Sequence, residues 1–354
     1  MYYVQFNLEK KYINDFLRLP QKLYHHDNPE NATEMKQLLE GTHPLSKYFQ
    51  LYKFLVYQNQ KVVGRFAITV YPEDDTAYIG FFECIDNQEA AKMIFDTARE
   101  FAKKNNFRRI VGPVDASFWI KYRLKTNMFD KKPYTGEPYN KNYYLKMFLD
   151  NRYQVIEHYT SSIYQSIDDS YENDKFSDRY EEFLKNGYEI VSPNMNDFDT
   201  ILKELYSLLT NLYSDFPIYK PLSKEDFVDT FRHYRKLMNP EMIKLAYYNH
   251  KMVGFYISIP NYYQLVYHIN ILNLFKIVSL KKKPKEYVML YMGVDQEHRG
   301  LGKALVYSIM KELKKSNLPS IGALARDGKI TQNYAEELIE DRYEYVLLEE
   351  KIDG

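Results

Sequence analysis

Alternating apolar and polar positions recur at two places along the chain. Residues 58–71 read QNQKVVGRFAITVY and residues 248–259 read YNHKMVGFYISI, and both contain a Val-Gly pair within a run of period-two alternation. An apolar strand precedes each run, at residues 51–57 and 242–248. The pattern therefore predicts two β-hairpins, and their likeness predicts an internal repeat.

Each half of the repeat continues with the pattern of an amphipathic helix. Apolar residues recur at helical spacing over residues 89–104 and again over residues 302–315. A short apolar strand follows each helix, at residues 108–111 and 320–324. Strand, helix and strand in this order predict a crossover between neighbouring strands of a mixed sheet.

A polar segment, residues 165–177 (QSIDDSYENDKFS), separates the two halves. We therefore expect two domains, residues 1–165 and 166–354. The halves differ by two insertions, residues 113–141 and 261–285. Connections of this length commonly carry function.

Charge and hydropathy narrow the classes of partner. Lys plus Arg and Asp plus Glu each number 48, so no net field attracts nucleic acid or an anionic bilayer over long range. Asparagine and lysine interrupt the longest apolar run, residues 269–280, which is also shorter than the roughly 20 residues that cross a bilayer. We expect no nucleic-acid partner, no membrane partner and no transmembrane helix.

The single cysteine and the histidines offer little chemistry. Cys84 has no partner for a disulfide and follows Phe81 and Phe82, which is typical of a small buried hydrophobe. His25 and His26 are adjacent and have no further ligand at metal-binding spacing, so we expect no metal. Because the first twelve residues contain no uninterrupted apolar core, we also expect a reducing, cytoplasmic location.

The strongest local signal is YVMLYMGVDQEHRGLGKAL, residues 287–305: an apolar strand, a polar turn and a glycine-rich start of a helix. A helix N-terminus carries unpaired N–H groups and a positive partial charge, and glycines let the backbone approach an anion closely. The spacing matches neither the dinucleotide-binding fingerprint nor the P-loop. It predicts an anion site that a pyrophosphate would fit.

The segment Arg299 to Ala304 resembles the R-x-x-G-x-G/A signature of the GNAT N-acetyltransferase superfamily, which also lies between a strand and a helix. The resemblance covers residues 188–351, and the repeat extends it to the first half. There residues 88–92 (QEAAK) contain neither glycine nor arginine where the phosphate loop belongs. The whole chain is similar to bacterial tandem-GNAT proteins. This implies an α/β fold of two modules, each a mixed, mostly antiparallel sheet flanked by helices, the first without a cofactor loop.

The resemblance also implies an activity: acetyl transfer from acetyl-CoA, or another acyl-CoA, to the amine of a small molecule by direct attack in a ternary complex. It implies no metal. The backbone of the glycine turn would hold the pyrophosphate and the preceding strand would pair with the pantetheine. The implied acyl-CoA-binding residues are Met292, Gly293, Val294, Arg299, Gly300, Leu301, Gly302, Lys303 and Ala304.

Candidate proton-transfer residues also follow from the resemblance. The family's general acid is often a tyrosine on the helix after the next strand, which points to Tyr334 unless that residue only packs on the surface. Glu286, at the start of the central strand, is the first candidate base, and Asp295 the second. Glu286 follows Lys281, Lys282, Lys283 and Lys285, so it is alternatively a solvated neighbour of them. That lysine run is either an exposed loop or a partner of the nucleotide 3′-phosphate.

Several alternatives stay open at this point. Residues 112–122 either pack against the other half or form a wall of the acceptor pocket, and residues 261–280 line the acceptor or acyl channel or roof the core. A tandem-GNAT aminoacyl-transferase that uses charged tRNA is one rival function. A regulatory protein that binds acyl-CoA without turnover is the other.

Overall fold

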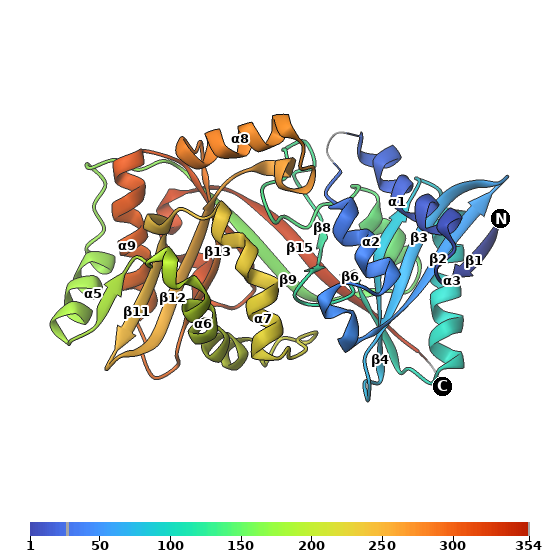
Figure 1. The fold of residues 1–354 in the computed structure, drawn as a ribbon, viewed down its shortest axis with the longest axis horizontal. Coiled ribbons are helices and arrows are strands. Elements are labelled where there is room, and N and C mark those ends of the chain that lie inside the picture. Colours follow the sequence, from blue (N-terminus) through green and yellow to red (C-terminus); the bar gives the residue numbers. More distant parts are fainter. Residues whose placement is uncertain (26–27, 353–354) are drawn as a thin grey trace.

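A computed structural model describes residues 1–25 and 28–352. The first half runs β1 (Tyr2–Phe6), α1 (Lys10–Tyr24), α2 (Ala32–Glu40), β2 (Gln50–Gln58), β3 (Lys61–Val70), β4 (Thr76–Cys84), α3 (Gln88–Lys104), β5 (Arg109–Gly112), β6 (Val114–Asp115), β7 (Lys121–Tyr122), β8 (Leu124–Lys125), α4 (Tyr144–Asp150) and β9 (Gln154–Tyr164). The second half runs α5 (Asp174–Lys185), β10 (Glu189–Val191), α6 (Phe198–Tyr213), α7 (Lys224–Phe231), β11 (Ile243–Tyr248), β12 (Lys251–Pro260), α8 (Ile271–Lys282), β13 (Tyr287–Val294), α9 (Leu301–Ser316), β14 (Ser320–Arg326) and β15 (Ile339–Lys351). Figure 1 shows the halves side by side along the long axis.

Both predicted hairpins and both predicted amphipathic helices are confirmed. β2 pairs antiparallel with β3, and β11 pairs antiparallel with β12. Gly64 and Gly254 occupy the same place in the repeat and share a packing role. A Cβ at Gly64 would lie 2.8 Å from Cδ1 of Ile94 on α3, and one at Gly254 would lie 3.1 Å from Cδ2 of Leu301 on α9. Glycine therefore lets each helix lie close against its sheet.

The described strands form one large mixed sheet in the order β1-β2-β3-β4-β5-β15-β9-β14-β13-β12-β11-β10, with β8 pairing β15; β6 and β7 form a separate small sheet. Two neighbouring pairs are parallel: β4 with β5, and β13 with β14. In the chain, α3 connects the first pair and α9 connects the second. This architecture confirms the predicted fold class.

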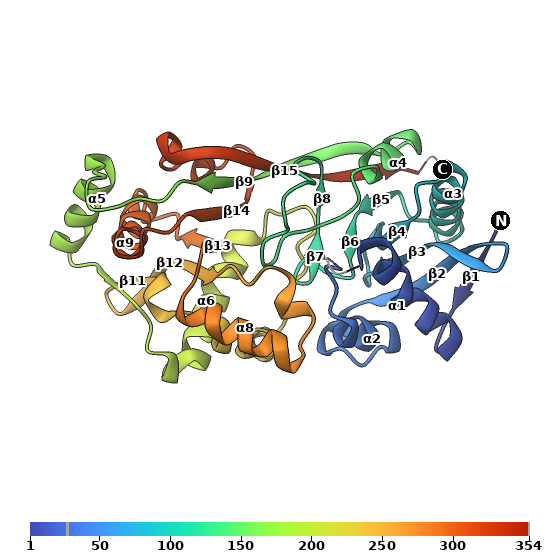
Figure 2. The same cartoon turned by 90° about the horizontal axis from the view of Figure 1, so that it is seen from above.

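The two halves exchange their last long strands. β9, from the first half, pairs with β14 of the second half, with Tyr164 opposite Ser320. β15, from the second half, pairs with β5 of the first half, with Leu348 opposite Gly112. Figure 2 shows β9 and β15 side by side, and they pair antiparallel along most of their length. The expected domain boundary at residue 165 falls directly after β9. The large sheet contains strands from both sides of this boundary and is continuous.

The insertion after β5 joins the halves by aromatic packing. The Trp119 indole N–H donates to the carbonyl of Lys220 at 2.8 Å, and the Trp119 ring packs against Phe227 of α7. Phe118 packs against Tyr213 and Phe216. Residues 112–122 thus pack against the other half, the first of the two alternatives, and none of them lines the large cavity described below.

Cys84 is fully buried in the core between α3, α4 and the sheet, which confirms its expected structural role. Burial raises the pKa of its thiol to about 12, so the thiolate is disfavoured at neutral pH. Across the described residues, no helix has the length and apolar character that crossing a bilayer requires.

Candidate acyl-CoA site

The parallel strands β13 and β14 part after three residue pairs. Tyr287, Val288 and Met289 are paired with β14, but no pairing continues beyond Met289. The register between β12 and β13 shifts at the same point. Ile257 is paired with Tyr291, but the next residue, Ser258, is paired with Met289. Leu290 therefore has no partner and forms a β-bulge. From the bulge to Val294, the edge of β13 on the side of β14 has no strand partner, so its backbone could pair with an extended ligand.

The glycine turn lies where this open edge ends. Gly300 has a φ of 93°, a conformation that favours glycine, and it immediately precedes α9. Gly302 is buried, and a Cβ built on it would lie 2.7 Å from the Tyr334 hydroxyl oxygen and 2.9 Å from Cε of Met292. The turn is therefore a narrow cradle in which only glycine leaves room beside the helix backbone.

The N-terminal end of α9 is chemically suited to an anion. It has no side-chain cap and no acidic residue in its first turn. Within the turn, the Leu301 and Lys303 N–H groups donate to the carbonyls of His298 and Gly300 at 3.2 and 3.1 Å. Two of the N–H groups that were predicted to bind the pyrophosphate are therefore hydrogen-bonded within the turn in this structure. No side chain of the first turn compensates the positive partial charge of the helix end.

Residues distant in the sequence complete the surroundings of the turn. A Cβ at Gly300 would lie 3.8 Å from Nε of Arg179, which is on α5. The Tyr188 hydroxyl and Nδ1 of His298 are 2.7 Å apart. Arg179 was not identified from the sequence because it lies far from the motif and belongs to none. Its guanidinium pairs with the Glu182 carboxylate at 2.6 Å and lies beside the turn.

Tyr334 reaches the turn, but not from a helix. It lies between two short 3₁₀ turns, Ile330–Asn333 and Glu336–Leu338, so the expected helical setting is wrong. Ala335 takes a left-handed backbone conformation, with a φ of 51°, which ends any helical run, and β15 begins at Ile339. The Tyr164 hydroxyl donates to the Tyr334 carbonyl at 3.1 Å, and the Tyr334 ring packs edge-on against Phe176. Burial raises the Tyr334 pKa, so the phenol stays protonated.

Glu286 lies at the opposite end of β13 from the turn. Its carboxylate accepts a hydrogen bond from the Asn261 side-chain amide at 2.5 Å, and Asn261 in turn accepts from the Thr135 N–H at 3.1 Å. Burial raises the Glu286 pKa above its ordinary value. A carboxyl with a raised pKa is a better base near neutral pH than a solvated one. By contrast, the Asp295 carboxylate accepts from the Glu297 N–H at 3.1 Å and so shapes the turn.

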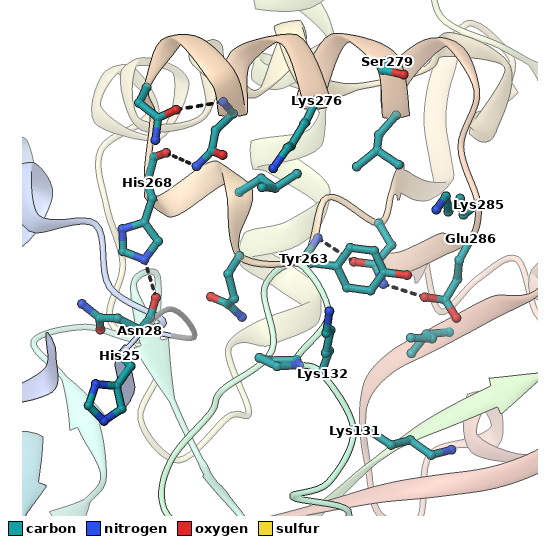
Figure 3. Close-up of a pocket in the computed structure, with 18 of the residues that line it drawn as sticks. His25, Asn28, Lys131, Lys132, Tyr263, His268, Lys276, Ser279, Lys285 and Glu286 are labelled. Atoms are coloured by element: carbon teal, nitrogen blue, oxygen red, sulfur yellow. Dashed lines mark hydrogen bonds between the residues drawn. The ribbon is translucent and has the colours of Figure 1, made fainter. Parts of the chain in front are cut away.

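Glu286 lines a cavity of about 1250 Å³ between the two halves. Figure 3 shows Lys276 on α8 and Lys132 on the first-half insertion pointing into it from opposite sides. Residues 261–280 contribute much of the wall, so this segment does line a cavity. The lysine run lies at the start of β13, about seven strand steps from the glycine turn, or roughly 23 Å. This separation disfavours the 3′-phosphate alternative. The run is not simply an exposed loop either, because Lys281 and Lys282 end α8 and Lys285 lines the cavity.

The corresponding place in the first half is filled by protein. A Cβ at Gly80 on β4 would lie 1.8 Å from the Val114 carbonyl oxygen, and the Phe81 N–H donates to the Asp115 carboxylate at 2.5 Å. The end of α3 is also closed, because the Asn87 side chain accepts from the Ala90 N–H and Glu89 lies in the first turn. The unpaired strand edge and the uncapped helix start are therefore found in the second half and not at the corresponding place in the first.

Glu83, on β4 of this closed site, should make the stability depend on pH. Its carboxyl accepts from the Tyr144 hydroxyl at 2.6 Å, and burial raises its pKa from 4.5 to about 7. Between these values the folded state binds more protons than the unfolded state, so the free energy of unfolding falls as pH rises from 5 to 8. We expect a fall of up to about 3 kcal/mol from this group.

Urea unfolding at pH 5 and pH 8 measures this dependence. Glu83→Gln keeps the hydrogen-bond acceptor and should remove most of the difference, whereas Glu89→Gln, at an exposed position, should keep it. Equal slopes in all three proteins would contradict an electrostatic role for Glu83.

Among the described residues, no group of three or more His, Cys, Asp or Glu side chains gathers as a metal site would require. His26, one of the two adjacent histidines, lies outside the described residues.

Comparison with known proteins gives structural matches only. No protein-family model and no curated protein sequence matches the chain. A tandem GNAT protein from the clavulanic acid biosynthesis pathway is similar over 100% of this chain and 99% of its own, with a TM-score of 0.57 and 11% identity. The glucosamine N-acetyltransferase region of a fungal multi-domain GH3 β-N-acetylglucosaminidase aligns with 98% of this chain and 38% of its own, with a TM-score of 0.53 and 14% identity. A GCN5-related N-acetyltransferase from Sphaerobacter thermophilus covers 99% and 96%, with a TM-score of 0.50 and 10% identity.

These matches define the class of fold as that of the GCN5-related acetyltransferases. The full-length alignment with the clavulanic acid protein makes it specifically a tandem GNAT fold, in agreement with the repeat, the two parallel strand pairs and the exchanged strands.

Proposed function

We propose that the protein is an acyl-CoA-dependent N-acyltransferase whose second half binds the donor. The observation that carries this proposal is the coincidence, at one place, of the open β13 edge, the Gly302 cradle and the uncapped start of α9. The closed first half supplies an internal comparison, since the same repeat there has none of these three features.

The residues present fit an acyl-CoA. The N–H groups around Gly302 and the guanidinium of Arg179 would hold the pyrophosphate. The β13 edge from Met292 to Val294 would pair with the pantetheine amides, which places the thioester near the bulge at Leu290. Acyl-CoA supplies an activated carbonyl, and the chain supplies position and hydrogen-bond donors.

The proposed reaction is direct attack of an amine on the thioester. The nitrogen lone pair forms the C–N bond, the carbonyl oxygen becomes an oxyanion, and a β13 backbone N–H near the bulge stabilises it. Collapse breaks the C–S bond. Glu286, four residues before the bulge, would accept through water the proton that the amine loses. Tyr334, whose hydroxyl lies beside Gly302, would likewise give a proton through water to the departing thiolate.

The cavity between the halves is our candidate for the acceptor site. Glu286 and Ile321 place its wall at the closed end of the β13–β14 pair. Four lysines line it: Lys131, Lys132, Lys276 and Lys285. Lysine attracts carboxylate and phosphate groups as a point charge, so we propose a small-molecule amine that also carries an acidic group. Acetyl is the simplest acyl group.

Calorimetry with acetyl-CoA, followed by a thiol-release assay over a panel of small amines with and without acidic groups, tests the proposal. We expect saturable binding at one site and release of CoA with the acidic amines. Binding with no release for any amine would instead favour a regulatory acyl-CoA-binding protein. Absence of binding would remove the proposed donor site.

Glu286→Gln should lower kcat by about 100-fold while leaving acetyl-CoA affinity unchanged, because the amide cannot take a proton. Because burial raises the pKa of Glu286 above its ordinary value of 4.5, wild-type activity should fall as pH drops through that raised pKa, and this acidic limb should disappear in the variant. The pH profile of kcat measures both. Glu336→Gln, at an exposed site in the second half, is the matched control.

A further inference from the structure

Helix α8 presents an apolar face to solvent. Ile271, Leu274, Phe275 and Val278 follow helical spacing and are 75%, 52%, 71% and 46% exposed. Leu272 and the preceding Ile269 extend this surface and are also exposed. Large apolar side chains gathered at this exposure mark an interaction surface, because a monomer in water rarely keeps such a patch. We call these six residues the α8 patch.

Helix α8 is apolar on more than one side. It contributes Asn273, Lys276, Ser279 and Leu280 to the wall of the cavity, and Ile277 is its one buried residue, but its largest apolar side chains are left exposed. A helix that served only to cover the core would turn its apolar side inward. In both views α8 lies at the periphery of the molecule, with no other element outside it.

Positive charge lies at the C-terminal end of the α8 patch. The helix contains no acidic residue, and its end carries Lys281, Lys282 and Lys283, whereas Lys285 lines the cavity. Lys281 donates to the Lys236 carbonyl at 2.8 Å, and in the described part of the chain none of these three lysines has a carboxylate within 4.0 Å. The overall balance of charges therefore conceals a local basic region, which the expectation of no membrane partner did not consider.

We propose that α8 docks the protein on an anionic membrane surface. The helix would lie in the plane of the interface, with Phe275 and its apolar neighbours at the headgroup–acyl boundary and the lysines among lipid phosphates. A symmetric dimer through the same patch would cover the apolar face but would leave the lysines without an anionic partner. An anionic bilayer would bury the apolar side chains and also place anionic headgroups beside the lysines.

Vesicle co-sedimentation of the full chain tests the proposal. We expect binding to phosphatidylcholine vesicles that contain about 30% phosphatidylglycerol, weaker binding without the anionic lipid, and weakening with added salt. Phe275→Glu should lower the partition coefficient by at least about tenfold, and Lys282→Glu with Lys283→Glu should do so mainly at low salt. Leu8→Glu makes the same kind of change at a residue that is 62% exposed elsewhere, and should bind as the unmodified protein does.

Light scattering and acetyl-CoA calorimetry accompany each variant. Equal vesicle binding by Phe275→Glu and Leu8→Glu would overturn the proposal, as would a protein that never binds anionic vesicles. A dimer that Phe275→Glu converts to a monomer, without vesicle binding, would assign the α8 patch to a second copy and overturn it too. Because the glycine turn lies at the other end of β13, acetyl-CoA affinity should be the same in all these variants, so failure of docking and failure of the donor site are distinguishable.

Discussion

Gly302→Glu should abolish acyl-CoA binding while leaving the protein folded. Any side chain at this position extends towards the Tyr334 hydroxyl and Met292 Cε, which are 2.7 and 2.9 Å from the Cβ position. The glutamate would also place a negative charge where a pyrophosphate has to bind. We expect the Kd for acetyl-CoA to rise at least about 100-fold, equivalent to about 2.7 kcal/mol, as measured by calorimetry.

Two further variants separate bulk from charge. Gly302→Ala adds only the crowded methyl group and should weaken binding by about tenfold, and Tyr334→Phe in the same chain should restore part of that loss by removing the hydroxyl. Ser316→Glu adds the same charge at the opposite, exposed end of α9 and should leave affinity unchanged. An unchanged Kd in Gly302→Glu, with thermal unfolding also unchanged, would exclude the turn as the donor site.

The features that the sequence predicted well are those that depend on neighbouring residues. Period-two alternation identified both hairpins, and helical spacing identified α3 and α9 to within a residue or so at each end. The glycine turn was recognisable because its chemistry lies within six consecutive residues between a strand and a helix. These local patterns were sufficient for the fold class.

The features that the sequence could not reveal depend on contacts between distant segments. β9 and β15 are each plausible last strands of their own half, and no local pattern distinguishes that arrangement from the observed exchange. Arg179 reaches Gly300 only because α5 packs beside α9. The setting of Tyr334 was mispredicted because its segment reads as helical, although Ala335 takes a left-handed conformation ahead of β15.

The sequence also could not show which side of a helix faces the rest of the protein. Residues 269–280 stood out as the longest apolar run, but composition does not show which of these residues face the protein. Only the structure shows that Asn273 and Lys276 of α8 line the cavity while Ile271 and Phe275 are exposed. Glu286 illustrates the same limit, since its raised pKa depends on burial, which arises from segments far apart in the chain.

Tyr334→Phe should separate chemistry from donor binding. The Tyr334 hydroxyl lies over Gly302, at the end of the open β13 edge, and burial keeps it protonated by raising its pKa above the ordinary value of 10. If this phenol protonates the departing thiolate, kcat should fall by about 10- to 100-fold in the variant. The Kd for acetyl-CoA should stay within about twofold, because phenylalanine keeps the packing against Phe176.

The pH dependence distinguishes an acid from a packing residue. Activity that needs the protonated phenol is lost as pH rises through the Tyr334 pKa, so the basic limb of the wild-type kcat profile should lie above pH 10 and be absent in Tyr334→Phe. Tyr307→Phe, on the same helix as Gly302 but farther from its start, should retain both kcat and the limb. A Tyr334→Phe enzyme with undiminished kcat would mean that the thiolate leaves unprotonated or takes its proton from water, and Tyr334 would then serve only to close the cradle beside Gly302.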